Sequence, residues 1–567
     1  MSDPFPHLHV ASGYSLQYGA SHPHLLVERA AGLGMDTLAL TDRDGAYGAV
    51  KFVRACRQAG LRPVLGVDLA YRVARAPRAP EGPRTPARGG VHRDLPLERG
   101  GLARATVLAG SDTRGGRAGW AALCRLVSAV HLAGERGSPV LDLLDARQLP
   151  GEVGELLAGG DLVVLLGPGS ALAAAATHRS DDLARAALAP WLRLVPRTHL
   201  VVELVSHRLP GARAGGWGPG TTPHAARMAG IARRAGLTTV LTNAVRYAER
   251  RDAVTVDVLD AARRLVALDH RHLERRNAEG YLKSGAQMHE IAEEISRATG
   301  LLGEDARRGA DRLLAATRAL SDRCVLDPRG DLGLGEVHLP DLPDLAGSAG
   351  RGGPDASLRA RCEGAIGDRY GSGPRQVVWK RLDDELELIR GLGYASYFLT
   401  VADVTDLVRE MGVRCAARGS GAGSLVTHLL GVSGVDPIRH GLLMERFLNP
   451  LRRALPDIDL DVESARRLEV YERVLDRFGG ERCLTVSMMD TYRVRHAVRD
   501  VGAALGMPPG ETDALAKAFP HIRARDARAA MRDLPELRAG AVAPELLLDL
   551  VERLDGLPRH VAMHPCG

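Results

Sequence analysis

Hydrophobic and polar residues follow two different rhythms along the first seventy residues. Residues 22–34 and 48–60 carry apolar side chains at helical spacing, whereas residues 35–42 and 61–70 are short apolar-rich runs that end in turns. A period of about 3.6 residues predicts an amphipathic helix, and a short apolar run between such helices predicts a buried strand. The alternation therefore predicts an α/β layer with parallel strands.

The same rhythm returns further along the chain after one long interruption. Residues 75–101 are rich in Pro, Arg and Gly and lack an apolar period, so we expect a flexible insertion there. Further buried strands are predicted by apolar runs at residues 161–167, 199–205 and 237–243. Helices are predicted over residues 286–321 and 380–393, and the Gly- and Pro-rich connection between them favours a domain boundary.

The composition excludes several classes of protein. With 567 residues, 45% of them hydrophobic, the chain is long enough for several domains with ordinary buried cores. No apolar run approaches the roughly 20 residues that cross a bilayer, and the N-terminus has no signal-peptide pattern. The expected location is therefore the cytoplasm, with no membrane partner. The seven cysteines are scattered and never spaced as CxxC, which argues against a disulfide framework and a structural zinc site.

Positive charge is modest overall but concentrated towards the C-terminal end. The formal net charge is +6, which fits a polyanionic partner and also follows from an arginine-rich composition alone. Helical spacing after residue 490 brings several arginines to one face. The arginines that cluster after residue 490, several of them on that face, are Arg493, Arg495, Arg499, Arg523, Arg525 and Arg528. Both a nucleic-acid-binding face and an ordinary solvated helix face fit this pattern.

Aspartates occupy every second position of the segment LPDIDLD. In a strand, Asp457, Asp459 and Asp461 point to one face, with neighbours about 6.6 Å apart along the chain. Carboxylates this close repel one another, and the usual compensation is a hard cation such as Mg²⁺ or Mn²⁺. An EF-hand loop also begins D-x-D-x-D, but it needs Gly and Glu where this chain has Val462 and Leu468. The remaining alternative is an exposed acidic strand edge without a ligand.

A Gly- and Ser-rich loop stands upstream in the segment CAARGSGAGSLVTHLLG, between a strand-like run and an apolar helix. Small residues let the backbone approach a phosphate, and the N–H groups of the helix start can hold it together with Arg418, Ser420 and Ser424. The segment lacks the Lys of a Walker loop, and GxGxG is not the dinucleotide fingerprint. A plain helix N-cap turn is the alternative. With Arg446 and the aspartates, the span fits a triphosphate and two metal ions.

Longer motifs carry a resemblance to the bacterial C-family DNA polymerases, the DNA polymerase III alpha subunit family. The chain contains, in the order found in that family, GYASYFLTVADV, ARGSGAGSLV, GVDPIRHGLLMERFLNP, PDIDLDVES, TYRVRHAVRDVGAALG and RHVAMHPCG. Its N-terminal segment resembles the PHP domain that opens those polymerases, so the resemblance covers essentially the whole chain. VHLAGERG and DIDLDVES are closer to the error-prone branch than to the main replicative one.

The resemblance implies a mixed fold in four parts. An α/β PHP-type (β/α) barrel is expected at residues 1–270, followed by the first part of an α+β polymerase palm at residues 271–485. A thumb-like helical segment is expected at residues 486–550, and the start of a returning palm segment at residues 551–567. In relatives the third catalytic carboxylate and the clamp-contacting regions lie beyond the last motif found here. The chain is therefore expected to be an incomplete and, by itself, inactive catalytic unit.

The resemblance also implies roles residue by residue. Asp457 and Asp459 match two of the metal-holding catalytic carboxylates, with Asp461 in support. The residues expected to bind the dNTP triphosphate are Arg418, Gly419, Ser420, Ser424 and Arg446. Those expected to contact DNA are Arg493, Arg495 and Arg499. The implied activity is template-directed DNA synthesis with Mg²⁺, or with Mn²⁺ in its place. Its implied partners are primer–template DNA and dNTPs, and in full-length relatives a sliding clamp and other replication or mutasome proteins.

The PHP part departs from the pattern of a working metal-dependent phosphoesterase. His7, His9 and Asp42 survive from the ligand set, and Asp68 stands where relatives carry Glu. Other ligand positions are occupied by Tyr18, Arg43, Ala244 and Arg246. Two arginines oppose a cation site electrostatically, so metals are expected to be absent here and the histidines to be structural. A PHP-type phosphoesterase and a non-catalytic DNA-binding fragment are the alternative functions.

Overall fold

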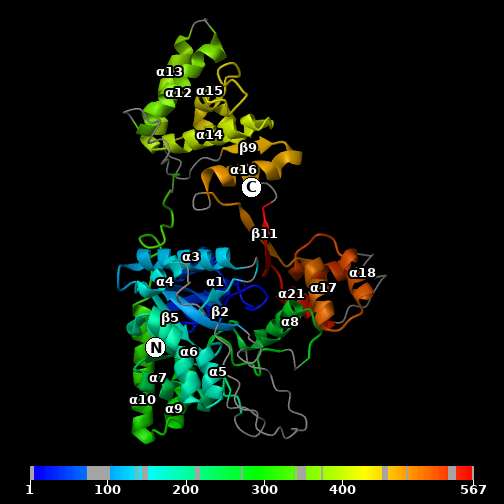
Figure 1. Cartoon of the computed structure of the whole chain (residues 1–567). Coiled ribbons are helices and arrows are strands. Elements are labelled where there is room, and N and C mark those ends of the chain that lie inside the picture. The colour runs from blue at the N-terminus through cyan, green and yellow to red at the C-terminus, as the bar shows by residue number, and fades with distance from the viewer. Residues whose placement is uncertain are drawn as a thin grey trace. The chain divides into compact units, whose positions relative to one another are not determined.

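The computed structural model describes most of the chain, which divides into two compact units (Figure 1). The described residues are 5–72, 102–134, 137, 139–143, 151–210, 218–269, 273–337, 339–340, 353–371, 375–449, 458–479, 483–533 and 545–564. The first unit comprises Met1–Leu334 and Met489–Ala562, and the second Gly335–Met488 and Met563–Gly567. The insertion expected at residues 75–101 lies outside the described residues, as does Asp457.

A seven-stranded sheet forms the centre of the first unit. Its strands are β1 (Thr37–Arg43), β2 (Arg62–Arg72), β3 (Ala103–Ala109), β4 (Leu141–Asp142), β5 (Leu162–Leu166), β6 (Leu200–Leu204) and β7 (Thr238–Leu241). The order is β1-β2-β3-β5-β6-β7, with β4 beside β2. All neighbours are parallel except β3, which is antiparallel to β2 and β5.

Strand β3, which the sequence pattern did not identify, is the exception to the parallel direction. A parallel return needs a crossover connection, usually a helix. The Pro- and Gly-rich segment between β2 and β3 has no apolar pattern for such a helix, so nothing in it requires β3 to run parallel to β2. The remaining strands share one direction, as the alternation of helices and strands predicts.

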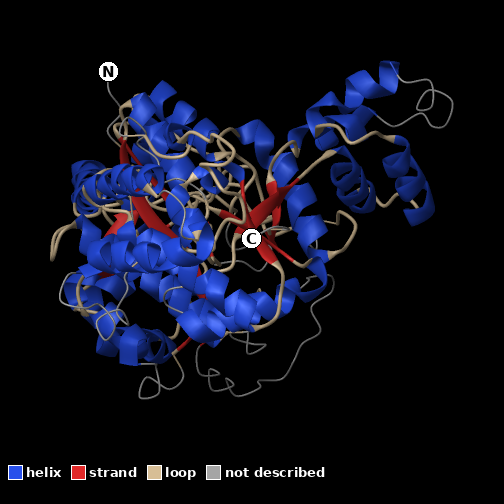
Figure 2. Ribbon diagram, turned by 90° about the horizontal axis from the view of Figure 1, so that it is seen from above, coloured by secondary structure: helices blue, strands red, loops and turns tan. Residues whose placement is uncertain are grey.

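The strands of this sheet are buried on both faces. On one face, Ala39, Val64 and Val201 belong to an inner cluster that Leu320 joins. On the other face, Leu38 and Leu65 belong to the larger cluster between the sheet and the helices (Figure 2). Burial on both sides explains why these strands are continuous apolar runs in the sequence.

Helices follow most of the strands, as the sequence predicts. They are α1 (Pro23–Gly32), α2 (Ala49–Ala59), α3 (Gly116–Ala133), α4 (Gly151–Ala158), α5 (Ala171–Thr177), α6 (Asp181–Leu194), α7 (Thr222–Ala235), α8 (Ala253–Arg264), α9 (Gly285–Ala298) and α10 (Gly303–Asp322). In α2, for example, Phe52, Val53 and Cys56 lie on one buried face while the polar residues face outward.

The N-terminal segment joins the two edges of the curled sheet. His7 bridges to Leu38 of β1, and Val10 bridges to Val245, which follows β7. The backbone N–H of Ala39 donates to the carbonyl of His7 at 3.0 Å, and that of Val245 donates to the carbonyl of His9 at 2.9 Å. The segment that carries both histidines is thus fixed between β1 and the chain after β7.

The predicted thumb-like segment is helical and packs within the first unit. Its elements are β10 (Ser487–Thr491), α17 (Val494–Ala504), α18 (Pro509–Ala518), α19 (Ala527–Asp533) and α21 (Glu545–Arg553). Strand β11 (Pro558–Met563), in the segment predicted as the start of a returning palm, pairs with β10. Val258 and Leu259 of α8 share one buried cluster with Tyr492, Val498 and Leu547. This shared core attaches the segment to the sheet-containing part of the unit.

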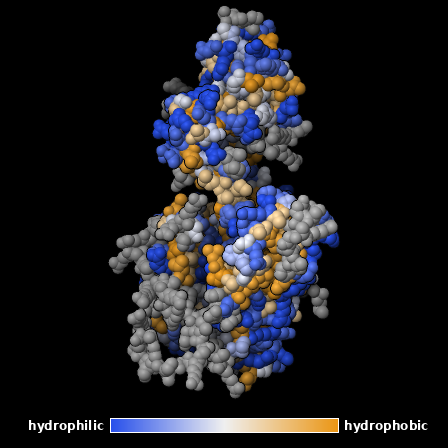
Figure 3. Space-filling view, turned by 90° about the vertical axis from the view of Figure 1, so that its right-hand side faces the viewer, coloured by the Kyte–Doolittle hydropathy of each residue, from blue (hydrophilic) through white to orange (hydrophobic). Residues whose placement is uncertain are grey.

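The second unit is mainly helical. Its elements include α12 (Gly353–Tyr370), α13 (Gln376–Leu392), α14 (Ala395–Glu410), β8 (Cys415–Arg418), α15 (Leu425–Leu429), β9 (Asp459–Val462) and α16 (Arg467–Phe478). Leu382, Phe398 and Phe447 centre its core. Figure 3 shows many hydrophilic side chains on its visible surface, at the top of the view, with apolar patches between them. Within the part of the chain that the structure describes, no helix is long and apolar enough to cross a membrane.

Candidate functional site

The Gly-rich loop and the acidic strand meet at a two-stranded antiparallel sheet of the second unit, whose strands are far apart in the sequence. Strand β8 pairs with β9, and Arg418 lies opposite Asp459. The loop follows β8 at once as a 3₁₀ turn at Gly419–Gly423. Along β9 the side chains of Asp459 and Asp461 are exposed, whereas Leu460 packs against the core. Two of the three predicted carboxylates therefore share an open face; the third, Asp457, lies outside the described residues.

Arg418 contacts both of these carboxylates. Its Nη2 lies 3.4 Å from Oδ2 of Asp459, and its Nε donates to Oδ1 of Asp461 at 3.2 Å. The predicted phosphate ligand is thus a counter-ion of the acids in this structure.

Close packing holds the loop against the start of β9. A Cβ built on Gly421 would lie 3.4 Å from Ile458 and 3.5 Å from Phe447, which are ordinary van der Waals distances, so the loop packs beside both side chains here. Ile458 in turn donates its backbone N–H to the hydroxyl of Tyr397 at 3.0 Å. Gly419 has a φ of +77°, a left-handed conformation that glycine adopts without strain.

A buried glutamate that sequence analysis missed caps the helix after the loop. Glu385 accepts from the backbone N–H groups of Leu425 and Val426 at 3.0 and 3.1 Å, and from the hydroxyl of Ser424 at 2.8 Å. Arg381 balances its charge at 2.7 Å. The start of α15 therefore already holds an anion, and Ser424 is buried with its hydroxyl on Glu385. The available signal was a single acid on the apolar face of α13.

The other predicted triphosphate ligands lie open. Gly419 and Ser420 are exposed at the beginning of the loop, and Arg446 is exposed in the short turn Met444–Arg446, which lies against the loop. The donor set next to them, two hard carboxylates on one face, suits a divalent cation. Among the residues that the structure describes, no cluster of three or more His, Cys, Asp or Glu side chains could hold a metal ion.

The arginines after residue 490 differ in how far they are neutralised. Arg493 is exposed at the start of α17, and Arg495 donates to the carbonyl of Phe519 at 2.8 Å. Arg499 forms an ion pair with Asp513 at 2.8 Å. Arginines nearer the C-terminus are also paired: Arg523 with Asp555, and Arg528 with Glu545, Asp549 and Glu552.

The two PHP histidines are fixed by hydrogen bonds in the first unit. His7 is buried and donates from Nε2 to the carbonyl of Lys283 at 2.9 Å, and burial lowers its pKa to about 4. His9 lies 2.8 Å from Oε1 of the buried Glu203. Burial alone would lower the pKa of His9, but the charge of Glu203, its hydrogen bond to His9 and the charge of Asp68 together raise that pKa. His9 and Glu203 therefore form an ion pair within the domain.

Asp42, the third surviving ligand position, is directed at serines. It accepts from the backbone N–H of Ser12 at 2.7 Å and from the hydroxyl of Ser15 at 2.7 Å. Burial raises its pKa to about 6 in spite of these hydrogen bonds. Its oxygens are engaged within the N-terminal loop.

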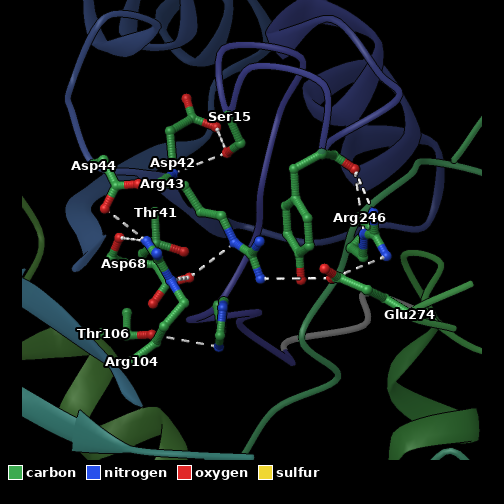
Figure 4. A network of polar contacts seen from close by, with 12 residues as sticks. Ser15, Thr41, Asp42, Arg43, Asp44, Asp68, Arg104, Thr106, Arg246 and Glu274 are labelled. Atoms are coloured by element: carbon green, nitrogen blue, oxygen red, sulfur yellow. Dashed lines mark hydrogen bonds and ion pairs between the residues drawn. The ribbon is translucent and has the colours of Figure 1, made fainter. Parts of the chain in front are cut away.

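Arginines neutralise the remaining acids of the PHP centre (Figure 4). Arg43 and Arg104 lie 3.3 and 2.9 Å from Oδ2 of Asp68, and Arg104 also reaches Asp44 at 2.8 Å. Burial alone would raise the pKa of Asp68, but the two guanidinium groups outweigh it and lower that pKa. A metal ion at Asp68 would have to displace both arginines.

Arg246 completes this network from the far side of Tyr18. It pairs with the buried Asp260 at 2.7 Å and donates to the carbonyl of Tyr18 at 3.0 Å. Glu274 lies 3.9 Å from both Arg43 and Arg246. The sequence pattern singled out Arg43, Arg246 and Asp68, but not Asp260 or Glu274. The residues of this centre do not fit a metal cluster, since guanidinium groups already take its carboxylates.

Comparisons with known proteins agree with the motifs. Residues 356–567 match the family described as the bacterial DNA polymerase III alpha NTPase domain, and residues 7–207 match the PHP domain. The chain is 32% identical over 586 residues to an error-prone DNA polymerase of Nocardia farcinica, covering 100% of this chain and 47% of that protein. It is also 32% identical over 572 residues to one of Mycobacterium bovis, covering 99% and 45%.

The chain thus spans about half the length of the curated relatives it matches. Among solved structures, an amidohydrolase from Chromobacterium violaceum matches with a TM-score of 0.26 and 15% identity, covering 43% of this chain and 87% of that chain. The family matches and the sheet of the first unit confirm the predicted mixed α/β fold with an N-terminal PHP domain.

Proposed function

We propose that this chain, which matches the bacterial DNA polymerase III alpha NTPase domain over residues 356–567 and the PHP domain over residues 7–207, belongs to the bacterial DNA polymerase III alpha family and forms part of an error-prone DNA polymerase. The proposed reaction is template-directed transfer of a nucleotide to the primer 3′ hydroxyl. The observation that carries the proposal is the pairing of β8 with β9, because it brings the Gly-rich loop directly beside the acidic face of β9.

In this proposal the acidic strand is the metal-binding element. Asp457 and Asp459 hold Mg²⁺, or Mn²⁺ in its place, and Asp461 supports them. Bound ions of this kind lower the pKa of the primer hydroxyl and neutralise charge on the triphosphate. The protein's own contribution is to keep Asp459 and Asp461 on one open face, which the hydrogen bond from Ile458 to Tyr397 helps to fix.

The loop is the proposed triphosphate site. Gly419 and Ser420 offer exposed backbone and hydroxyl groups. Positive charge is supplied by Arg418, directly before the loop, and by Arg446, in the turn that lies against it. Ser424 contributes indirectly, because its hydroxyl ties the loop to Glu385. Primer–template DNA is the proposed partner of Arg493, Arg495 and Arg499. For the PHP centre we propose a structural role without metal ions, because its acids are paired with arginines.

Metal binding tests the proposal directly. Electron paramagnetic resonance of free Mn²⁺ should show that the double variant Asp457→Asn, Asp459→Asn binds the ion roughly tenfold or more weakly than the wild type. Asp476→Asn, an exposed aspartate of α16, is the matched control and should leave the affinity unchanged. Equal affinity in the wild type and the double variant would overturn the proposal.

A further inference from the structure

We propose that Arg418 is the resident counter-ion of the acidic strand β9 and exchanges partners when a divalent cation and a nucleotide bind to the polymerase site. A divalent cation displaces its guanidinium group from Asp459 and Asp461, and the displaced group then turns to the nucleotide triphosphate. This inference rests on the function proposed above. It adds a coupling between metal binding and nucleotide binding that passes through one side chain.

The pairing of β8 with β9 places Arg418 beside Asp459 and Asp461. Arg418 and Asp459 are directly opposite in the antiparallel ladder, so their side chains lie on the same face. Asp461 follows two residues later on that face. One guanidinium group therefore spans both carboxylates, at 3.4 Å from Asp459 and 3.2 Å from Asp461.

The guanidinium group and a divalent ion compete for the same oxygens. Mg²⁺ binds carboxylate oxygens at about 2.0 to 2.1 Å and keeps several of its waters. An arginine in contact with both acids blocks this approach, and its positive charge repels the ion. The contacts of Arg418 are nevertheless weak, because its side chain is 61% exposed and those of Asp459 and Asp461 are 51% and 65% exposed. Arg418 is therefore a competitor that a metal ion can displace.

The displaced group has a second partner within reach. Arg418 is the residue that immediately precedes Gly419 and Ser420, the exposed part of the loop. Rotation of its side chain about a fixed backbone position carries the guanidinium from the acids towards a triphosphate on the loop. Guanidinium groups bind phosphate oxygens well because their N–H groups match them in pairs. Metal binding thereby frees a phosphate ligand, and by linkage nucleotide binding favours the metal.

The alternative is that Arg418 forms an ordinary surface ion pair without effect on either ligand. A second arginine next to the same pair of strands allows this alternative to be tested. Arg414 precedes β8, is 89% exposed and lies 3.7 Å from Glu463, which follows β9. It shares the ribbon and the charge of Arg418 but contacts neither Asp459 nor Asp461 in the structure. Arg414→Gln therefore controls for the loss of one positive charge on this ribbon.

The first arm of the test measures Mn²⁺ binding to the 567-residue chain without nucleotide. Arg418→Gln should bind Mn²⁺ about three- to tenfold more tightly than the wild type, because a competitor and a repelling charge are gone. Arg414→Gln should change the affinity much less. A gain in ligand affinity on removal of a side chain is not expected from a merely structural residue. Circular dichroism and thermal unfolding verify that each variant is folded.

The second arm measures binding of a fluorescent deoxynucleoside triphosphate with and without Mg²⁺. Arg418→Gln should weaken binding in the presence of Mg²⁺ and reduce the gain in affinity that Mg²⁺ brings. Mn²⁺ affinity in Arg418→Gln equal to or weaker than in the wild type would overturn the exchange. If Asp459→Asn weakens Mn²⁺ binding while Arg418→Gln does not strengthen it, the exchange fails and the proposed metal site stands. If Asp459→Asn has no effect, both fail.

Discussion

The guanidinium carbon of Arg43 lies 3.2 Å from the centre of the Tyr18 ring. That of Arg246 lies 3.8 Å from the same centre, so one aromatic ring contacts two cations. Such contacts are stabilising by about 2 kcal/mol when they are desolvated. Each arginine also meets an acid, Asp68 in one case and Asp260 in the other. In the PHP centre, these arginines therefore supply positive charge that the neighbouring carboxylates balance.

We expect the stability of the first unit not to depend on divalent metals. Chelation with EDTA, or addition of Zn²⁺ or Mn²⁺, should leave the midpoint of thermal unfolding unchanged, because Arg43 and Arg104 already neutralise Asp68. Differential scanning calorimetry provides the measurement. A lower midpoint after chelation would contradict the arginine-balanced centre.

Removing one partner of the buried ion pair between Arg246 and Asp260 should destabilise the first unit. Replacing Arg246 by Met leaves the buried Asp260 with Arg263, also at 2.7 Å, as its remaining arginine partner, and should lower the free energy of unfolding by about 3 kcal/mol. The matched control is Arg251→Met, an arginine that is 75% exposed and should contribute little. Urea unfolding compares the two variants; similar losses would show that the buried pair is not a specific source of stability.

His7 gives the first unit a defined sensitivity to acid. Burial lowers its pKa from 6.5 to about 4, so between these values the unfolded chain binds a proton that the folded chain does not. The contribution of His7 to the free energy of unfolding is therefore present above pH 6.5. It is lost as the pH falls towards 4, by roughly 3 kcal/mol in total.

Denaturant unfolding at pH 7 and at pH 4.5 measures this effect. His7→Gln should show a smaller loss of stability between the two pH values than the wild type. The exposed His178→Gln serves as the control and should behave as the wild type. Parallel losses in all three proteins would rule out His7 as the source.

Glu385 should be needed for an ordered triphosphate loop. Its replacement by Ala leaves the first N–H groups of α15 and the charge of Arg381 without their partner. We expect the free energy of unfolding of the second unit to fall by about 3 to 5 kcal/mol, since a buried charge pair is broken. Hydrogen exchange at Leu425 and Val426 should accelerate. Glu387→Ala, an exposed glutamate of the same helix, should affect neither quantity.

Periodicity in the sequence predicts the elements that carry these residues. The apolar runs at β1, β2, β5, β6 and β7 are strands because both of their faces are buried, and that leaves a local signature. The shared face of Asp459 and Asp461 follows from alternation in a strand and is present in β9. Each of these features depends on neighbours within a few residues.

Long-range charge pairing leaves no such signature. Asp68 meets Arg104 across 36 residues, and Ser424 meets Glu385 across 39, so no local pattern indicates which arginine or hydroxyl faces which acid. The apolar face of α13 predicts that Glu385 is buried, but its partner at the start of α15 depends on how the helices pack. The direction of β3 likewise depends on a connection without periodicity.

The arginines after residue 490 should contribute unequally to DNA binding. Each phosphate that a protein charge neutralises lowers log K by about 0.9 per log unit of salt. Arg493 is exposed, so Arg493→Gln should reduce the salt slope by about that amount if it contacts a phosphate. Arg499 is already paired with Asp513, so Arg499→Gln should reduce it less.

Fluorescence anisotropy of labelled primer–template DNA over a range of salt concentrations gives the slope for each protein. The triple variant, with Gln at Arg493, Arg495 and Arg499, should flatten the slope more than any single change. Each phosphate contact releases its own counter-ions. Arg312→Gln, an exposed arginine of α10, controls for the loss of one positive charge from the same unit and should leave the slope unchanged. An unchanged slope in the triple variant would mean that this face is only solvated. A decrease of the salt slope as large in Arg312→Gln as in Arg493→Gln would mean that net charge, rather than these positions, determines the affinity for DNA.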